Sequence, residues 1–522
     1  MGICHCKNKG RNSRRRELDG ASHNAAEDRR DTALEQDWWK SVSPKDVEML
    51  ILDSLKAIRS LVENDQEPPQ ELFKLHNIAD QDDGWIQIVD SMVRVVPVED
   101  PLGPAVITLL LDDCPLPNKN AVLRLSSKFN LSSKNRVSRG MDNRKPRNIC
   151  IALGVLAEKL SGPSSVAILT SATLDFLIGN LEDEIDPVVT LFSLIALEKF
   201  AQTSENKVTI KRRLAEAGDP LLRLEARPPS SDLIESQVKF CATWALDNLF
   251  LVEGRKFSYE TVDVLNINAM LNTKDVSEYL KISPDGLEAR CDAYSFESVR
   301  CTFPATEGVW FYEVLLLTPG VMQIGWALKH SKFLNHEGYG IGDDEYSVAY
   351  DGCRELVWFA ARSQEVGGGR WKAGDIVGTL LDIPAKVLHF YLNGVQVFSS
   401  DLLFTVSANK YFAGASFMSF QQCRFNFGSD PFRFPPDTEF KSFNDYASLS
   451  PQERIVLPRH LEMEALRNMS IREDSCAICF DSQAETTLIP CGHSGFCQTC
   501  TAQLFECPMC RAKIDRFTVD PT

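Results

Sequence analysis

The residues best suited to chemistry lie near the C-terminal end, where cysteine and histidine occur in pairs. The pairs are Cys476-x2-Cys479, Cys491-x-His493, Cys497-x2-Cys500 and Cys507-x2-Cys510. Zinc prefers thiolate and imidazole ligands in a closed shell of four, so four pairs predict two structural zinc ions. The surrounding chain is too short to build a stable core without metal. A disulfide knot is the alternative, which the ligand spacing and the lack of a visible signal peptide disfavour.

In order and spacing, the pairs resemble the ligands of a RING finger, whose second pair has the Cys-x-His form. The spacing alone predicts metal binding, whereas the assignment of pairs to ions comes from the family likeness. That likeness implies a cross-brace, in which pairs one and three share one zinc ion and pairs two and four share the other. The two ligand sets would be Cys476, Cys479, Cys497 and Cys500, and Cys491, His493, Cys507 and Cys510.

The RING resemblance implies a ubiquitin-protein ligase, which binds a ubiquitin-charged conjugating enzyme and needs no nucleophile of its own. Its contribution to ubiquitin transfer onto lysine is positional and electrostatic. Ile478 and Pro508 match positions where this family contacts the conjugating enzyme. Arg511 matches the cation that bridges that enzyme and ubiquitin, a task that suits the fixed donor fork of a guanidinium. Alternatively, Ile478 and Pro508 pack around the zinc ions and Arg511 is an ordinary exposed arginine.

Length and charge limit the remaining possibilities. A chain of 522 residues predicts several domains, and its net charge of −16 argues against nucleic acid as the main partner. The main rival to a ligase is therefore a non-enzymatic zinc-binding adaptor or scaffold. Cysteines outside the RING-like segment are mostly isolated, which fits the reducing cytoplasm. The longest apolar runs are too short or too interrupted to span a membrane.

The N-terminus carries a second pattern with a physical meaning. Gly2 follows the initiator methionine, Cys4 and Cys6 come next, and a run of lysines and arginines follows. An acyl chain beside a cationic patch forms a two-signal membrane anchor, so lipidation of Gly2, Cys4 or Cys6 and peripheral membrane contact are possible. However, Cys6 stands where the myristoylation pattern has Ser or Thr. The alternative is a disordered basic tail, and residues 1–42 have the polar composition of one.

Residues 43–255 predict an all-α region. Ser43 and Pro44 form a helix start, and apolar residues follow at helical spacing. Further helices are predicted over 85–96, 104–111, 149–160, 188–201 and 237–251, separated by proline-rich turns. Such a succession suggests an armadillo-like helical array, with an irregular bundle as the alternative, because the sequence has no clean repeat. Basic residues over 134–147 predict a solvated loop.

Residues 277–432 change to a period of two, which predicts an antiparallel β-sandwich. Trp310, Tyr312, Val314 and Leu316 alternate with other side chains, as in a strand. Asn393-Gly394 between two apolar runs predicts a hairpin with a type I′ turn. Asp343-Asp344-Glu345 is either a cation site or, in our preferred interpretation, a polar turn between strands. The tryptophans of this region are expected in the core.

Several motifs in this region resemble SPRY domains over roughly residues 285–430. They are Gly308-Val309-Trp310-Phe311-Tyr312-Glu313-Val314, Met322-Gln323-Ile324-Gly325-Trp326-Ala327, Gly338-Tyr339-Gly340-Ile341-Gly342-Asp343-Asp344-Glu345-Tyr346-Ser347, and Phe390-Tyr391-Leu392-Asn393-Gly394. The resemblance implies a binding module, whose loops take short peptide segments of a substrate or adaptor. Residues 433–472 are then a linker with a helix, and 473–514 are the RING. Leucines of this linker at 457, 461 and 466 could support a RING-mediated dimer or pack on the sandwich.

The order of helical region, SPRY domain and C-terminal RING resembles that of RING finger and SPRY domain-containing proteins. The resemblance implies that the SPRY domain recruits a substrate, while the RING recruits the charged conjugating enzyme. We therefore predict a RING-type ubiquitin transferase whose cofactors are two structural zinc ions.

Overall fold

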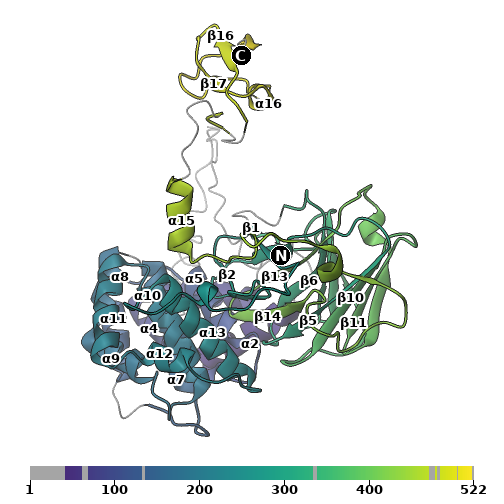
Figure 1. The fold of residues 1–522 in the computed structure, drawn as a ribbon. Coiled ribbons are helices and arrows are strands. Elements are labelled where there is room, and N and C mark those ends of the chain that lie inside the picture. The colour runs from purple at the N-terminus through teal and green to yellow at the C-terminus, as the bar shows by residue number, and fades with distance from the viewer. Residues whose placement is uncertain are drawn as a thin grey trace, which may run out of the picture. The chain divides into compact units, whose positions relative to one another are not determined.

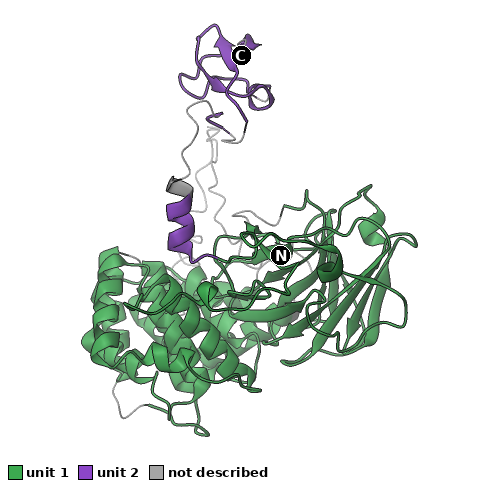
Figure 2. Cartoon of the chain, viewed as in Figure 1, with its two compact units in different colours: residues 1–456 green, residues 457–522 purple. Residues whose placement is uncertain are grey.

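The computed structural model describes residues 42–60, 69–131, 136–160, 162–332, 338–468, 476–478, 482–502 and 504–519. Gly2, Cys4 and Cys6 lie outside these ranges, as does nearly all of the predicted tail. The chain divides into two compact units, Met1–Val456 and Leu457–Thr522, which are coloured in Figure 2. Each unit is described by itself. No helix within the described ranges combines the length and apolar character that a membrane span needs.

The N-terminal half of the first unit is helical, as predicted, and Figure 1 shows its helices packed side by side. The helices are α2 (Pro44–Ser60), α3 (Gln70–Ala79), α4 (Asp82–Val95), α5 (Gly103–Asp113), α6 (Lys119–Phe129), α7 (Arg144–Leu160), α8 (Gly162–Ile168), α9 (Ser171–Gly179), α10 (Pro187–Phe200), α11 (Ser204–Glu216), α12 (Pro220–Glu225) and α13 (Leu233–Asn248). The all-α prediction is confirmed, while the armadillo-type repeat stays a prediction.

Local signals explain where several helices begin and which faces they bury. At the start of α2, the Asp46 amide donates to Ser43 Oγ and the Ser43 amide donates to the Asp46 carboxylate, which satisfies two free N–H groups. Helix α10 is buried on nearly every side, as its apolar sequence predicts. The predicted solvated loop over 134–147 is partly wrong, because α7 begins at Arg144.

Arg147 shows why that prediction fails. Its side chain is only 2% exposed, and its guanidinium donates to the carbonyls of Val96, Pro97 and Val98. These carbonyls belong to the C-cap residue of α4 and the two residues after it, and buried backbone acceptors of this kind need donors. A basic residue in a polar segment therefore holds the chain that leaves α4, a role that composition does not reveal.

The rest of the first unit is the predicted antiparallel β-sandwich. One sheet has the order β1-β4-β13-β6-β7-β8-β9 and the other the order β12-β11-β10-β5-β14-β3-β2. The strands are β1 (Leu271–Val276), β2 (Leu280–Ile282), β3 (Glu288–Cys291), β4 (Glu297–Cys301), β5 (Val309–Leu316), β6 (Met322–Ala327), β7 (Ser347–Asp351), β8 (Leu356–Phe359), β9 (Arg362–Glu365), β10 (Ile376–Asp382), β11 (Val387–Leu392), β12 (Val395–Ser400), β13 (Phe412–Phe417) and β14 (Gln421–Asn426).

The predicted hairpin joins β11 to β12. Asn393 and Gly394 have φ angles of 49° and 81°, the positive values that a type I′ turn needs at both central residues. The predicted tryptophan core is also confirmed, since Trp310, Trp326, Trp358 and Trp371 are each at most 2% exposed. Trp326 packs edge-on against Tyr312 between the sheets, with ring centroids 5.3 Å apart.

Strand β5, which the alternating sequence predicted, is buried on both faces. The segment after β14 folds back and covers the outer face, where the rings of Phe432 and Phe440 each lie 5.2 Å from that of Phe311. Glu313, also on this face, accepts hydrogen bonds from the Arg433 and Phe434 amides at 2.9 and 2.7 Å. The chain continues as β15 (Lys441–Ser442), which pairs with β5, and α14 (Phe443–Tyr446).

The second unit is small and has little apolar interior. Its elements are α15 (Arg459–Asn468), β16 (Thr486–Ile489), β17 (Ser494–Phe496), α16 (Gln498–Thr501) and β18 (Arg516–Val519). The strands form one sheet in the order β17-β16-β18. Leu488 and Phe496 are buried among Cys476, Cys497 and Cys507, with Ile514 and Phe517 packed alongside. Sulfur atoms therefore occupy much of what would be a core.

Candidate metal centre

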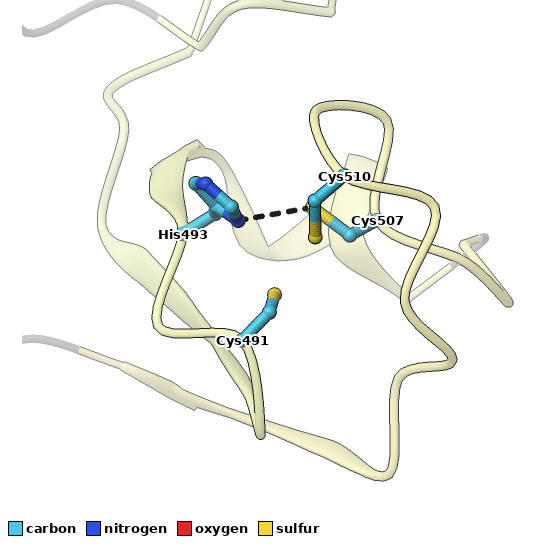
Figure 3. A group of neighbouring side chains, drawn as sticks. All are labelled: Cys491, His493, Cys507 and Cys510. Atoms are coloured by element: carbon cyan, nitrogen blue, oxygen red, sulfur yellow. Dashed lines mark hydrogen bonds between the residues drawn. The ribbon is translucent and has the colours of Figure 1, made fainter.

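Four predicted ligands from distant parts of the second unit meet at one point. The ligand atoms of Cys491, His493, Cys507 and Cys510 all lie within 4.8 Å of one another. Figure 3 shows the four side chains pointing toward a common centre. The turn between β16 and β17 supplies Cys491 and His493, and the segment before β18 supplies Cys507 and Cys510. Since β18 pairs with β16, the sheet brings the two pairs together.

Tight backbone turns aim these side chains inward. Between the first two ligands, Gly492 has a φ of 74°, and its amide donates to Leu488 O at 2.7 Å. Glycine adopts this left-handed conformation without steric cost. Between Cys507 and Cys510 the chain makes a second turn, closed by the Arg511 amide, which donates to Cys507 O at 2.7 Å. Arg511 itself has a φ of 58°.

The donor atoms of this cluster suit zinc. Cys507 Sγ lies 3.5 Å from His493 Nδ1, so sulfur and imidazole nitrogen share one side of the cluster. Burial acts to raise the pKa of Cys507, but the backbone N–H groups of Cys510 and Met509 donate toward its sulfur and lower the pKa to about 7. Thiolate is the form that binds metal, so these N–H groups favour ligation. Three sulfurs and one imidazole are a common structural zinc set.

A second cluster lies in the same unit. The sulfurs of Cys476, Cys497 and Cys500 also lie within 4.8 Å of one another. The Cys500 amide donates to Cys497 Sγ at 3.4 Å at the start of α16, and the Ile478 amide donates to Cys476 Sγ at 3.5 Å. Cys479, the fourth predicted member, lies outside the described residues. Cys476 of the first pair thus meets the third pair in one place, and the second and fourth pairs meet in another, which is the interleaved order of a cross-brace.

The three residues matched to conjugating-enzyme contacts are all on the surface. Ile478 is 41% exposed, and Pro508 and Arg511 are exposed as well. An isoleucine that packed around a zinc ion would be buried, so its exposure favours a contact role. Sequence reasoning did not single out Phe505 and Met509, which are 87% and 66% exposed. Their exposure could have been predicted, because both residues are apolar and the domain is too short to bury every apolar residue.

The acidic run of the sandwich acts as a turn. Asp343 accepts from the Gly340 amide at 2.8 Å, and Asp344 accepts from the Lys332 and Tyr346 amides at 2.7 and 2.9 Å. Carboxylates often close loops in this way. The preferred interpretation of these residues as a polar turn is therefore confirmed.

Comparison with known families defines the two domain classes. Residues 309–430 match the model of the SPRY domain, and residues 472–517 match that of the C3HC4-type zinc finger, the RING finger. The chain therefore contains a SPRY domain and a RING finger, as the motifs indicated. The RING finger is a zinc-binding domain, and the clustered cysteines and histidine are in keeping with zinc binding by this chain.

Among curated proteins, the chain is similar to E3 ubiquitin-protein ligase RKP of Arabidopsis thaliana, with 35% identity over 27% of this chain and 11% of that protein. It is also similar to E3 ubiquitin-protein ligase NEURL3 of Rattus norvegicus, with 45% identity over 9% of this chain and 21% of that protein. The chain thus spans a small part of these relatives. Among solved structures, the SPRY domain of human HERC1 is similar, at 13% identity, with a TM-score of 0.25 and coverage of 30% of this chain and 96% of that one.

Proposed function

We propose that this protein is a RING-type ubiquitin-protein ligase that promotes ubiquitin transfer from a charged conjugating enzyme to a lysine of its substrate. The observation that carries the proposal is the surface exposure of Ile478, Pro508 and Arg511 on a unit with two interleaved ligand clusters. The ligase names of the relatives support it. The SPRY domain recruits the substrate or an adaptor.

Two structural zinc ions complete the proposal. Cys491, His493, Cys507 and Cys510 would hold one, and Cys476, Cys479, Cys497 and Cys500 the other. When bound, zinc supplies folding free energy to the domain, because four protein ligands leave no open position for substrate or water.

The residues of this chain act by position. Ile478 and Pro508 offer apolar surface that binds the conjugating enzyme. Arg511 presents a guanidinium whose donors can bridge the enzyme and ubiquitin, which holds the thioester in one reactive orientation. Its left-handed backbone, at a φ of 58°, turns the chain directly after the last ligand. Orientation of bound reactants accelerates transfer without a covalent intermediate on the RING.

Discharge of ubiquitin from a charged conjugating enzyme onto free lysine tests the proposal. Arg511→Ala should slow discharge on the order of tenfold to a hundredfold, the worth of one or two charge-assisted hydrogen bonds. Bound zinc, measured by a chelating dye after denaturation, should be unchanged. Arg516→Ala is the matched control, since Arg516 is an exposed arginine of the same unit, on β18, and should discharge at the wild-type rate.

The rival function gives a different result. A non-enzymatic adaptor would bind zinc and capture partners, yet the wild-type protein would stay inactive with a broad panel of conjugating enzymes. That outcome would overturn the ligase proposal.

We further propose a cytoplasmic protein held at membranes by acylation at Gly2, Cys4 or Cys6 together with the basic run that follows. Metabolic labelling with acyl probes tests this, and no label at these residues would contradict it.

A RING-mediated dimer through the linker leucines is a separate proposal. Leu457 is 36% exposed, which leaves part of its side chain available for such a contact. Analytical ultracentrifugation tests this proposal: the wild type should sediment as a dimer and Leu457→Asp as a monomer.

A further inference from the structure

Within the first unit, buried charged side chains join the helical region to the β-sandwich. Lys281 of β2 is 4% exposed, and its Nζ lies 2.5 Å from Glu198 Oε2 of α10 and 2.7 Å from Asp292 Oδ2 just after β3. The ammonium also lies 4.5 Å from the centre of the Trp244 ring of α13. One cation thus contacts both helices and the strands at once, and Figure 1 shows α13 beside β14 and β2.

Arg290 forms the second half of this network. Its side chain is fully buried, and its Nε lies 2.9 Å from both oxygens of Asp292. Its Nη1 donates to Gln237 Oε1 of α13 at 3.0 Å and to Gln422 Oε1 of β14 at 2.8 Å. Gln237 in turn donates to Leu317 O at 3.2 Å. The guanidinium fork therefore has partners on helix α13, on strand β14 and in the segment just after β3.

Two basic and two acidic side chains meet inside the contact, where burial raises the pKa of Glu198 and Lys281 opposes that shift. Lys281 and Arg290 face Asp292 and Glu198, and each cation touches at least one carboxylate. Burial acts to raise the pKa of Asp292, but Arg290 and Lys281 hold it well below its usual range, so Asp292 stays ionised. A buried ion network adds little net stability compared with apolar packing, yet removal of one member leaves a charge without compensation. Such a network therefore tolerates only one arrangement of the surfaces that carry it.

We propose that Glu198, Lys281, Arg290 and Asp292 form an intramolecular lock that fixes the helical region on the sandwich in a single position. The face made by β2, β3 and β14 is then occupied by α10 and α13 and closed to other partners. Substrates of the SPRY domain must bind elsewhere on the sandwich. An apolar contact alone, such as the edge-on pair of Phe192 and Phe420 with centroids 5.2 Å apart, would permit sliding.

Hydrogen–deuterium exchange of the full-length protein tests the lock. Lys281→Met removes the cation that contacts both Glu198 and Asp292, so Asp292 keeps Arg290 while Glu198 loses its ion-pair partner. Exchange should rise on the order of a hundredfold on both sides of the contact, in peptides from α10 and α13 and from β2 and β3. Peptides from α4, β10 and β11 should keep wild-type rates. Lys56→Met is the matched control, because Lys56 pairs with Asp53 at the surface, with side chains 78% and 51% exposed, and should change nothing.

A double variant separates the effect of an unpaired charge from the effect of lost packing. Glu198→Gln combined with Lys281→Met removes one charge of each sign, so the double variant should exchange more slowly than Lys281→Met alone. Lys281→Arg, which keeps the cation, should stay closest to wild type and serves if Lys281→Met fails to fold. Faster exchange in β2 and β3 alone, or a double variant whose effect equals the product of the single effects, would overturn the lock. These readouts do not depend on ubiquitin transfer.

Discussion

The SPRY-containing unit and the RING unit solve the problem of stability in opposite ways. Buried aromatic rings hold the sandwich together, with Tyr312, Trp326 and Phe390 each fully buried. In the RING unit, Leu488 and Phe496 are buried together with Cys476, Cys497 and Cys507, and the buried threonines Thr486 and Thr501 lie in the same interior. A chain segment too short to bury enough apolar surface must rely on metal ligation instead.

The same difference governs how each unit presents its function. The RING unit leaves Ile478, Phe505 and Met509 on its surface, because zinc, not apolar burial, holds the fold. The sandwich buries most of its large apolar residues, with Tyr279, Tyr339 and Val395 among the exposed ones, and the segment after β14 covers the outer face of β5. A metal-held fold can therefore expose apolar side chains that a small domain without metal would need for its core.

The largest expected effect that separates the two units is loss of zinc. Chelation, or Cys491→Ser, should unfold the RING and reduce ubiquitin discharge to background, because structural zinc contributes on the order of 10 kcal/mol to such domains. All eight tryptophans of the chain lie outside residues 457–522. Tryptophan fluorescence therefore reports on the first unit alone, and its unfolding midpoint should not move.

Readdition of zinc to the chelated wild-type protein is the control and should restore discharge. A shift of the tryptophan midpoint on chelation would show that the stability of the first unit depends on the RING, and the contrast between the units would fail.

Trp326→Ala should have a smaller effect that falls on the other unit: it should lower the stability of the first unit and leave ubiquitin discharge unchanged. Removal of this fully buried indole, which donates to Thr379 Oγ1 and packs on Tyr312, should cost the sandwich about 3–5 kcal/mol. The tryptophan fluorescence midpoint in urea should fall accordingly. Discharge onto free lysine needs only the RING and should be unchanged; a parallel loss of discharge would contradict the separation of the two units.

The smallest predicted effect concerns an ion pair within the sandwich. Arg300 Nε and Nη2 each lie 2.9 Å from the carboxylate of Asp275, which joins β4 to the edge strand β1. Burial acts to raise the pKa of Asp275, but Arg300 and Lys329 lower it below its ordinary value. A lowered carboxyl pKa contributes stability above the unfolded pKa, and that contribution is lost as the pH falls through the folded pKa.

Asp275→Asn should therefore cost about 1–3 kcal/mol at neutral pH, the cost of weakening a buried charged hydrogen bond. The cost should shrink as the pH falls through the acidic range, since the wild-type carboxylate then becomes protonated. Urea unfolding followed by tryptophan fluorescence at several pH values measures both. Asp53→Asn, at a surface pair, should behave as wild type at every pH. A cost that does not vary with pH would rule out the ion pair as its origin.

Patterns confined to neighbouring residues were enough to predict much of this molecule. Ligand pairs with fixed spacing predicted metal clusters, and Asn393-Gly394 predicted a hairpin with positive φ angles at both residues. Apolar residues on every side of α10 predicted a buried helix. Each of these signals is local in the sequence, although the pairing of β16 with β18 is what brings two ligand pairs together. The exposure of Ile478, by contrast, could not be predicted from the sequence, because it depends on which residues the folded chain brings close to it.

The kinds of domain, the zinc-binding chemistry and the turn residues could be predicted from the sequence, because they depend on local spacing and intrinsic conformational preference. Three contacts became visible only in the folded chain: Arg147 binds the carbonyls just after α4, Glu313 holds the segment after β14, and Lys281 meets Glu198 of a distant helix. The physical reason is that any local sequence pattern predicts a charged side chain to be exposed to solvent. Whether it is buried depends on partners that only folding brings within hydrogen-bonding distance.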